Sequence, residues 1–152
     1  MKITKINKVL IAMDYDETSQ KVAEVGYSLA TAMKAETILI HVISEQPVYY
    51  SSYTYMRELR VDVLSDLKKS TQEFLNKAKK HLGNESIITI LKEGEIADTI
   101  LKTARELKVD VIVMGSHSRK WLENIIMGSE AENVLKMSTV PLFIIPTKKQ
   151  AE

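Results

Sequence analysis

A short segment between Gly115 and Ser129 carries the clearest chemical pattern in the sequence. Gly115 directly follows an apolar run, and Gly128-Ser129 directly precedes residues with helical spacing. A glycine after a strand allows a tight turn whose backbone N–H groups face a ligand. The first turn of a helix favours an anion such as a phosphate. The segment therefore predicts an anion-binding loop, with a strand-exit glycine and a serine N-cap as the structural alternative.

Two common phosphate-binding motifs and one catalytic arrangement are excluded by the sequence. Neither Gly-x-x-x-x-Gly-Lys-Ser/Thr nor Gly-x-Gly-x-x-Gly occurs. The neighbouring Ser116, His117 and Ser118, together with Asp14, invite a Ser-His-Asp hydrolase interpretation. Such a triad needs a strained elbow such as Gly-x-Ser-x-Gly, which is absent here. We therefore predict no catalytic residues.

Residues that bind metals tightly are scarce. The sequence has no cysteine and only three histidines, His41, His81 and His117. Disulfides, thiolate zinc sites, iron–sulfur clusters and cysteine nucleophiles are thereby excluded. We predict no metal site built from protein side chains, although Mg²⁺ can arrive with phosphates. His41 is interpreted as a hydrogen-bonded strand residue, and His81 as a solvated cation near a helix end.

Five apolar segments alternate with four segments of helical periodicity. Strands are expected over residues 8–13, 36–43, 86–91, 109–114 and 141–146. Helices are expected after a capping Asp16, from about residue 59 to a stop at Gly83-Asn84, over residues 96–107 and around residues 131–138. This alternation predicts an α/β fold, with a five-stranded parallel sheet of order 3-2-1-4-5 and helices on both faces.

The predicted sheet also places the ligand. In such sheets ligands bind beyond the carboxyl ends of the strands, where the strand order reverses. The reversal lies between the first and fourth strands, so a crevice is expected between the segments that follow Met13 and Met114. The glycine-containing segment is one of these two walls.

Taken together, these residues resemble the universal stress protein A family. Nucleotide-binding members of the family share a G-x-x-G-x9-G-S/T loop, and Gly115, the spacer 119–127 and Gly128-Ser129 fit that pattern. Segments 11–14, 40–42, 130–135 and 140–142 extend the resemblance over essentially the whole chain. The resemblance implies a Rossmann-like fold of the adenine nucleotide alpha hydrolase-like kind.

The resemblance further implies a site for ATP, or for ADP or AMP, with Mg²⁺ accompanying the nucleotide. Asp14 would hydrogen-bond the adenosine, the backbone of Val42 would contact the adenine, and Met114 and Gly115 would lie against base and ribose. Residues 116–118 and 128–131 would hold the phosphates. The full implied set is Ala12, Met13, Asp14, Val42, Met114, Gly115, Ser116, His117, Ser118, Gly128, Ser129, Glu130 and Ala131.

One position departs from the family pattern. Ser118 stands where the motif has its second glycine, and a Cβ there disfavours positive φ by about 1 kcal/mol or more. Since roughly 1.4 kcal/mol is tenfold in affinity, ATP binding is weakened rather than abolished.

Two functions therefore stay open. The first is an ATP-binding regulator or sensor in stress response, with slow hydrolysis at most. The second is a dimeric interaction module that has lost tight nucleotide binding.

The resemblance also implies a homodimer in which the last strand pairs across a two-fold axis. That strand would contribute Leu142, Phe143, Ile144 and Ile145. The physical reason is that an apolar edge strand left exposed invites association. A tyrosine-rich segment, Tyr49 to Tyr55, is interpreted as packing against its own helix or a partner subunit, with a lid beside the nucleotide as the alternative.

Length and charge bound the remaining possibilities. A chain of 152 residues with 45% hydrophobic residues predicts one globular domain over residues 1–146, followed by a polar tail over 147–152. Its 21 Lys and Arg against 20 Asp and Glu favour neither nucleic acid nor a membrane as partner. The apolar run ending at Asp14 is too short for a signal peptide or a bilayer span, so the cytoplasm is the expected compartment.

Overall fold

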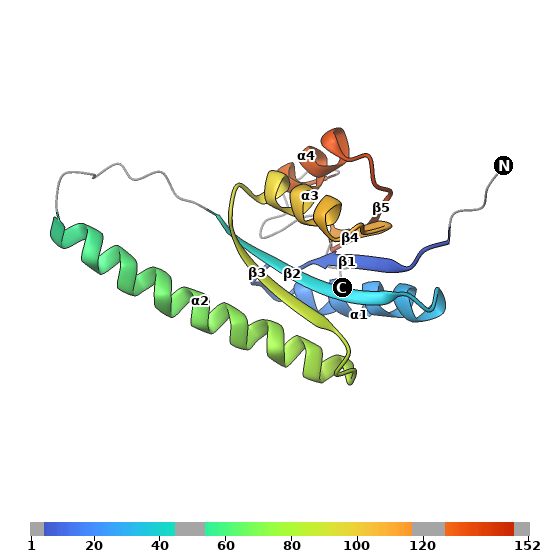
Figure 1. Ribbon diagram of the computed structural model, residues 1–152, viewed down its shortest axis with the longest axis horizontal. Helices are drawn as coiled ribbons and strands as arrows, with labels where there is room; N and C mark the ends of the chain where they lie inside the picture. The colour runs from blue at the N-terminus through green and yellow to red at the C-terminus, as the bar shows by residue number, and fades with distance from the viewer. Residues whose placement is uncertain (1–4, 45–53, 117–126, 148–152) are drawn as a thin grey trace, which may run out of the picture.

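Five parallel strands form one sheet in the order β3-β2-β1-β4-β5, as predicted (Figure 1). The computed structural model describes residues 5–44, 54–116 and 127–147. The strands are β1 (Lys8–Ala12), β2 (Glu36–Ser44), β3 (Ile88–Gly94), β4 (Val111–Gly115) and β5 (Leu142–Ile145). The helices are α1 (Ser19–Ala32), α2 (Thr54–Leu82), α3 (Ile96–Glu106) and α4 (Ser129–Met137).

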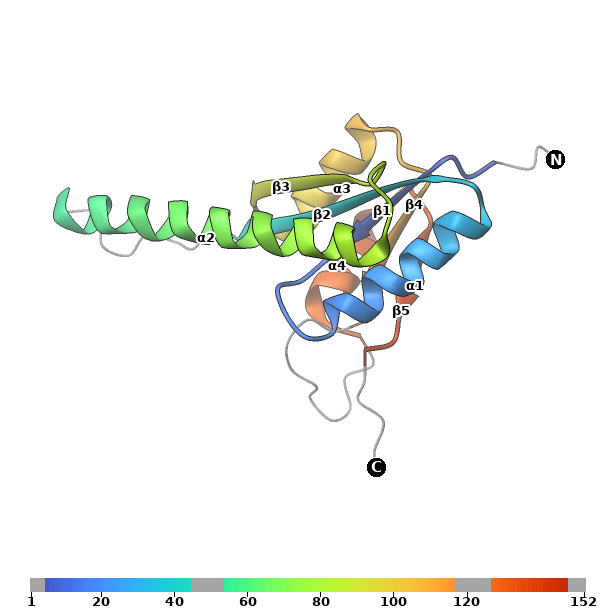
Figure 2. The same cartoon turned by 90° about the horizontal axis from the view of Figure 1, so that it is seen from below.

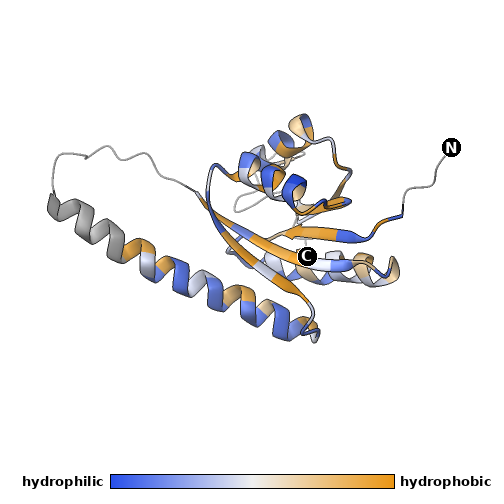
Figure 3. Ribbon diagram, in the orientation of Figure 1, coloured by the Kyte–Doolittle hydropathy of each residue, from blue (hydrophilic) through white to orange (hydrophobic). Residues whose placement is uncertain are grey.

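Helices cover both faces of the sheet, which confirms the predicted three layers. Helices α1 and α2 lie on one face, and α3 and α4 lie on the other (Figures 1 and 2). Successive strand residues enter opposite layers, so Leu10 packs towards α3 and α4 whereas Ile11 packs towards α1 and α2. Because both faces of β1, β2 and β4 are buried, these strands are largely apolar, as the colouring of Figure 3 shows.

Strands β3 and β4 differ from the prediction by two residues or more at one or both ends, and the other strands differ by at most one. Strand β3 starts at Ile88 and continues to Gly94, because Lys92 and Glu93 still pair with β2, and an edge strand tolerates such polar residues. Strand β4 starts at Val111 rather than residue 109. The N–H of Val109 is engaged with the carbonyl of Ala104 at the end of α3, at 2.9 Å.

Helix α1 packs unusually close to the sheet at Gly26. A Cβ built on Gly26 would lie 2.8 Å from Ile11 Cδ1 and 3.1 Å from Val113 Cγ1. Both isoleucine and valine are fully buried in the core beneath the helix. The missing side chain of Gly26 therefore sets the distance between α1 and the β1–β4 pair, the two strands at which the order reverses.

Helix α2 is long and only partly packed. Its C-terminal half covers the sheet through Leu75, which is fully buried, and it ends at Gly83 (φ 73°), which confirms the predicted stop. Its N-terminal half projects beyond the sheet (Figures 1 and 2). Along that half, Val63 and Leu67 are exposed. Of the predicted tyrosine segment, Tyr55 lies in the first turn of α2 and the remainder lies outside the described residues.

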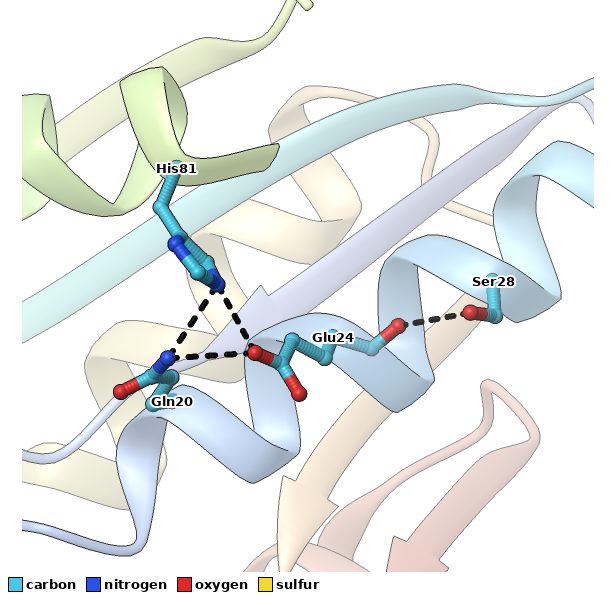
Figure 4. Close-up of polar contacts among 4 residues, drawn as sticks. All are labelled: Gln20, Glu24, Ser28 and His81. Atoms are coloured by element: carbon cyan, nitrogen blue, oxygen red, sulfur yellow. Dashed lines mark hydrogen bonds and ion pairs between the residues drawn. The ribbon is translucent and has the colours of Figure 1, made fainter. Parts of the chain in front are cut away.

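A polar cluster joins the C-terminal end of α2 to α1 (Figure 4). His81 Nε2 lies 2.8 Å from Glu24 Oε1 and 3.1 Å from Gln20 Nε2. Since a carboxylate only accepts, His81 donates to Glu24 through Nε2. His81 thus lies near the helix end and is about half exposed, as predicted, and it also links the two helices, which the sequence did not indicate.

This contact makes stability depend on pH in the acid range. The hydrogen bond from His81, followed by that from Gln20, holds the pKa of Glu24 below its ordinary value. A depressed carboxyl pKa stabilises the fold above the unfolded pKa, and that stabilisation is lost as pH falls through the folded value. We expect Glu24→Gln to be less stable than the natural protein at about pH 6, and the difference to shrink as the pH is lowered towards about pH 3. Urea denaturation at both pH values measures the difference.

Glu106→Gln is the matched control, because Glu106 is paired only weakly, at 4.0 Å from Lys102 Nζ. A Glu24→Gln difference that persists undiminished in acid would contradict the assignment.

The described residues include no helix that is both long and apolar enough to cross a membrane.

Candidate functional site

A cleft opens at the carboxyl ends of β1 and β4, where the strand order reverses. The space within the cleft, including the open solvent at its mouth, is about 500 Å³. Its walls come from the segments after β1 and β4, from the middle of β2, and from the first turns of α3 and α4. The lining residues are Ala12, Met13, Asp14, Ile40, His41, Val42, Ile96, Ile100, Met114, Gly115, Ser116, Gly128, Ser129, Glu130 and Ala131.

Every site residue implied by the sequence that the structure describes lines this cleft. His117 and Ser118 lie outside the described residues, so the departure at Ser118 stays a prediction. Sequence reasoning missed Ile40, His41, Ile96 and Ile100, which also line it. Ile96 and Ile100 lie in the helix predicted over residues 96–107. A usable signal was available, because the helix that follows a parallel strand begins at the same sheet edge as the ligand site.

The end of β1 is held by hydrogen bonds on both sides of Met13. Its N–H donates to the carbonyl of Ile40 at 2.8 Å, and its carbonyl accepts from His41 Nδ1 at 2.6 Å. His41 is thus the satisfied strand histidine that the sequence predicted. Its ring also meets Tyr15 edge-on, with ring centres 6.5 Å apart. These contacts fix the backbone that carries Asp14 into the cleft.

Ser116 joins three segments at the other wall. Its N–H donates to the carbonyl of Ile145 at 2.8 Å, its carbonyl accepts from Gly128 N at 2.6 Å, and its Oγ accepts from Thr147 N at 3.1 Å. The amides of Ser116 and Gly128 are therefore engaged within the protein. The capacity of α4 to bind an anion rests instead on the N–H groups of Ser129, Glu130 and Ala131, which precede the first helical bond, Glu132 N to Gly128 O.

Glu130 gives this wall an unusual electrostatic character. Its Oε2 is buried and has no hydrogen-bond partner. Burial raises the pKa of Glu130, and the nearby charges of Glu95 and Asp14 raise it further. Glu95 is itself engaged, because its carboxylate accepts from Ala97 N and from Asp98 N at the start of α3. A ligand that donates a hydrogen bond, such as a ribose hydroxyl or an adenine amine, would satisfy the Glu130 oxygen.

Apart from Asp14, His41, Ser116, Ser129 and Glu130, the described lining residues are apolar or glycine. The described lining contains no lysine or arginine, and the described residues include no group of three or more His, Asp or Glu that could hold a metal ion. Apolar walls with a few convergent polar groups suit the flat face and polar edge of a nucleobase. The arrangement is one that binds and orients a ligand.

The sequence profile described as "Universal stress protein family" matches residues 5–146. The chain belongs to this family. It is 33% identical over 145 residues to Universal stress protein YxiE of Bacillus subtilis, covering 91% of this chain and 98% of that protein. It is 30% identical over 158 residues to Universal stress protein MJ0577 of Methanocaldococcus jannaschii, covering 93% of this chain and 95% of that protein.

Solved universal stress proteins share the fold. The structure of MJ0577 superposes with a TM-score of 0.78 at 27% identity and covers 97% of this chain and 100% of that chain. A universal stress protein solved in complex with cAMP gives a TM-score of 0.71 at 21% identity, covering 95% of this chain and 100% of that chain, which is a likeness of fold. The sheet order and the Rossmann-like architecture are therefore those of universal stress proteins.

Proposed function

We infer that this universal stress protein is a regulator or sensor that binds an adenine nucleotide in the cleft between β1 and β4. One observation carries the inference: Asp14, Gly115 and the first turn of α4 converge on a single cleft at the reversal of strand order. ATP, ADP and AMP are the candidate ligands, with Mg²⁺ arriving on the phosphates. The cAMP complex of a relative with the same fold supports a ligand of this chemical class.

Each wall has a defined task in this proposal. Asp14 hydrogen-bonds the adenosine, Val42 and Met114 enclose the base, and the first-turn amides of α4 face the phosphate nearest the ribose. These roles bind the nucleotide and do not require its hydrolysis, so we propose that hydrolysis is slow at most. A role in stress response and a location in the cytoplasm belong to the same proposal.

Isothermal titration of metal-stripped protein with ATP and Mg²⁺ tests the binding. We expect saturable heat with one nucleotide per chain, and mass spectrometry of the gently purified protein to detect a retained adenine nucleotide. The absence of both heat and competition at millimolar nucleotide would remove the proposal.

A second candidate function is a dimeric interaction module that has lost tight nucleotide binding. The open edge of the sheet favours it, because β5 pairs with β4 and its Phe143 side chain is 40% exposed. The two copies would pair through Leu142, Phe143, Ile144 and Ile145. Light scattering at high concentration should give the mass of a dimer, and Phe143→Lys should give a monomer.

A Ser118→Gly variant tests whether nucleotide binding has been lost. If the natural protein already binds ATP tightly and Ser118→Gly binds it no more tightly, there is no reason to invoke lost nucleotide binding.

A further inference from the structure

Glu130 places a carboxylate where an anion-binding helix terminus would receive phosphate. The amide groups of Ser129, Glu130 and Ala131 form the first turn of α4 and line the cleft. The N–H groups of such a turn attract an anion. The side chain of Glu130 begins at the same turn, and its buried, unpartnered Oε2 belongs to the wall that the phosphates would meet. Attraction from the backbone and repulsion from the carboxylate thus arise at the same turn of α4.

Other carboxylates surround Glu130 and reinforce the repulsion. Asp14 approaches from the end of β1, and Glu95 approaches from the start of α3. No lysine or arginine lies among the described lining residues, and Arg119 and Lys120 lie outside the described part of the chain. A cleft with low-dielectric walls and charges of one sign focuses their field on whatever enters it. Each additional phosphate of a ligand therefore meets a growing electrostatic cost.

We propose that Glu130 is a specificity-determining residue that makes the cleft discriminate among adenine ligands by phosphate charge. The inference rests on the proposed nucleotide site and specifies which adenine ligands that site prefers. Adenosine and AMP bind better than metal-free ATP, whereas Mg²⁺ on the polyphosphate offsets the repulsion. The unpartnered oxygen of Glu130 accepts a hydrogen bond from a hydroxyl or amine of the nucleoside, so the same carboxylate that rejects phosphate retains the nucleoside.

The test compares adenosine, AMP, ADP and ATP by isothermal titration, first with a chelator and then with Mg²⁺, on the natural protein and on Glu130→Gln. We expect metal-free ATP to bind Glu130→Gln about tenfold more tightly, the size of one partly screened like-charge contact. Adenosine affinity should not rise. Glu132→Gln is the matched control, because Glu132 lies on the same turn, is exposed, and pairs with Lys136 at 3.0 Å. It should leave all four affinities unchanged.

The acid range provides a second measure of the same charge. Burial, followed by the nearby charges of Glu95 and Asp14, raises the pKa of Glu130, so this carboxylate takes up its proton as the pH is lowered. The ratio of ATP affinities between Glu130→Gln and the natural protein should therefore fall towards one as the pH is lowered. Titrations below about pH 5 keep the phosphate charge nearly constant, because the second phosphate pKa is about 6.

Two outcomes distinguish a failure of the charge discrimination from a failure of the proposed nucleotide binding. If adenosine binds but metal-free ATP binds the natural protein equally well and Glu130→Gln changes nothing, the charge discrimination is wrong and the nucleotide site stands. If adenosine, AMP and Mg²⁺-ATP all fail to bind every variant, the proposed function itself is wrong and the discrimination falls with it.

Discussion

Replacing Asp14 with alanine is expected to weaken adenosine binding about thirtyfold. A hydrogen bond to a charged group contributes about 2 kcal/mol, and roughly 1.4 kcal/mol is a factor of ten in affinity. Asp14 lies in the cleft on a backbone that Ile40 and His41 hold in place, so the loss is not recovered by a shift of the chain. Adenosine is the ligand to titrate, because removal of a carboxylate would also relieve repulsion of phosphates.

Two controls sharpen this measurement. Asp98→Ala removes an exposed carboxylate from the first turn of α3 and should leave adenosine affinity unchanged. Asp14→Asn keeps an acceptor and should lose less than Asp14→Ala. Circular dichroism of each variant checks that the fold is intact. Equal adenosine affinity in Asp14→Ala and the natural protein would show that this side chain does not hold the nucleoside.

Replacing Gly26 with valine is expected to lower the free energy of unfolding by about 3 kcal/mol, the upper part of the range for overpacked cores. A Cβ alone already lies within 3.1 Å of Ile11 and Val113, and the two γ-methyl groups of valine extend further into the same side chains. Helix α1 must move away from the sheet to accommodate them. Urea denaturation followed by circular dichroism measures the change.

Ser28→Val is the matched control for Gly26→Val. Ser28 is exposed on the same helix, and serine and valine differ little in helix propensity. Its stability should stay within about 0.5 kcal/mol of the natural protein. Because valine favours a helix over glycine, a close approach of α1 to the sheet is the feature that makes Gly26→Val destabilising. An unchanged midpoint for Gly26→Val would contradict that approach.

The fold was predictable because its signals are local and mutually consistent. Runs such as residues 9–12 are apolar throughout, which is typical of strands buried on both faces, and Gly83 ends its helix as predicted. Errors occurred where tertiary contacts decide the boundary. Lys92 and Glu93 join β3 because they pair with β2 at an open edge, and no local preference of these residues indicates it.

The candidate site was predictable to the extent that topology determines it. The reversal of strand order brings the segments after β1 and β4 together, so Asp14 and Gly115 share a cleft whatever their side chains. The burial of one Glu130 oxygen, the engagement of the Ser116 amide with Ile145, and the pairing of His81 with Glu24 were not predictable. Each depends on a side chain or amide meeting a residue that is distant in sequence.

The projection of α2 affects how the molecule moves through solution. A helix of 29 residues is about 43 Å long, which exceeds the diameter of about 38 Å for a uniform sphere with the radius of gyration of a compact 152-residue chain. Such an arm increases friction without adding mass. A monomer should therefore elute early from a sizing column and give an apparent mass above 17.2 kDa. An apparent mass read from the elution volume alone would therefore overestimate the number of chains in the particle.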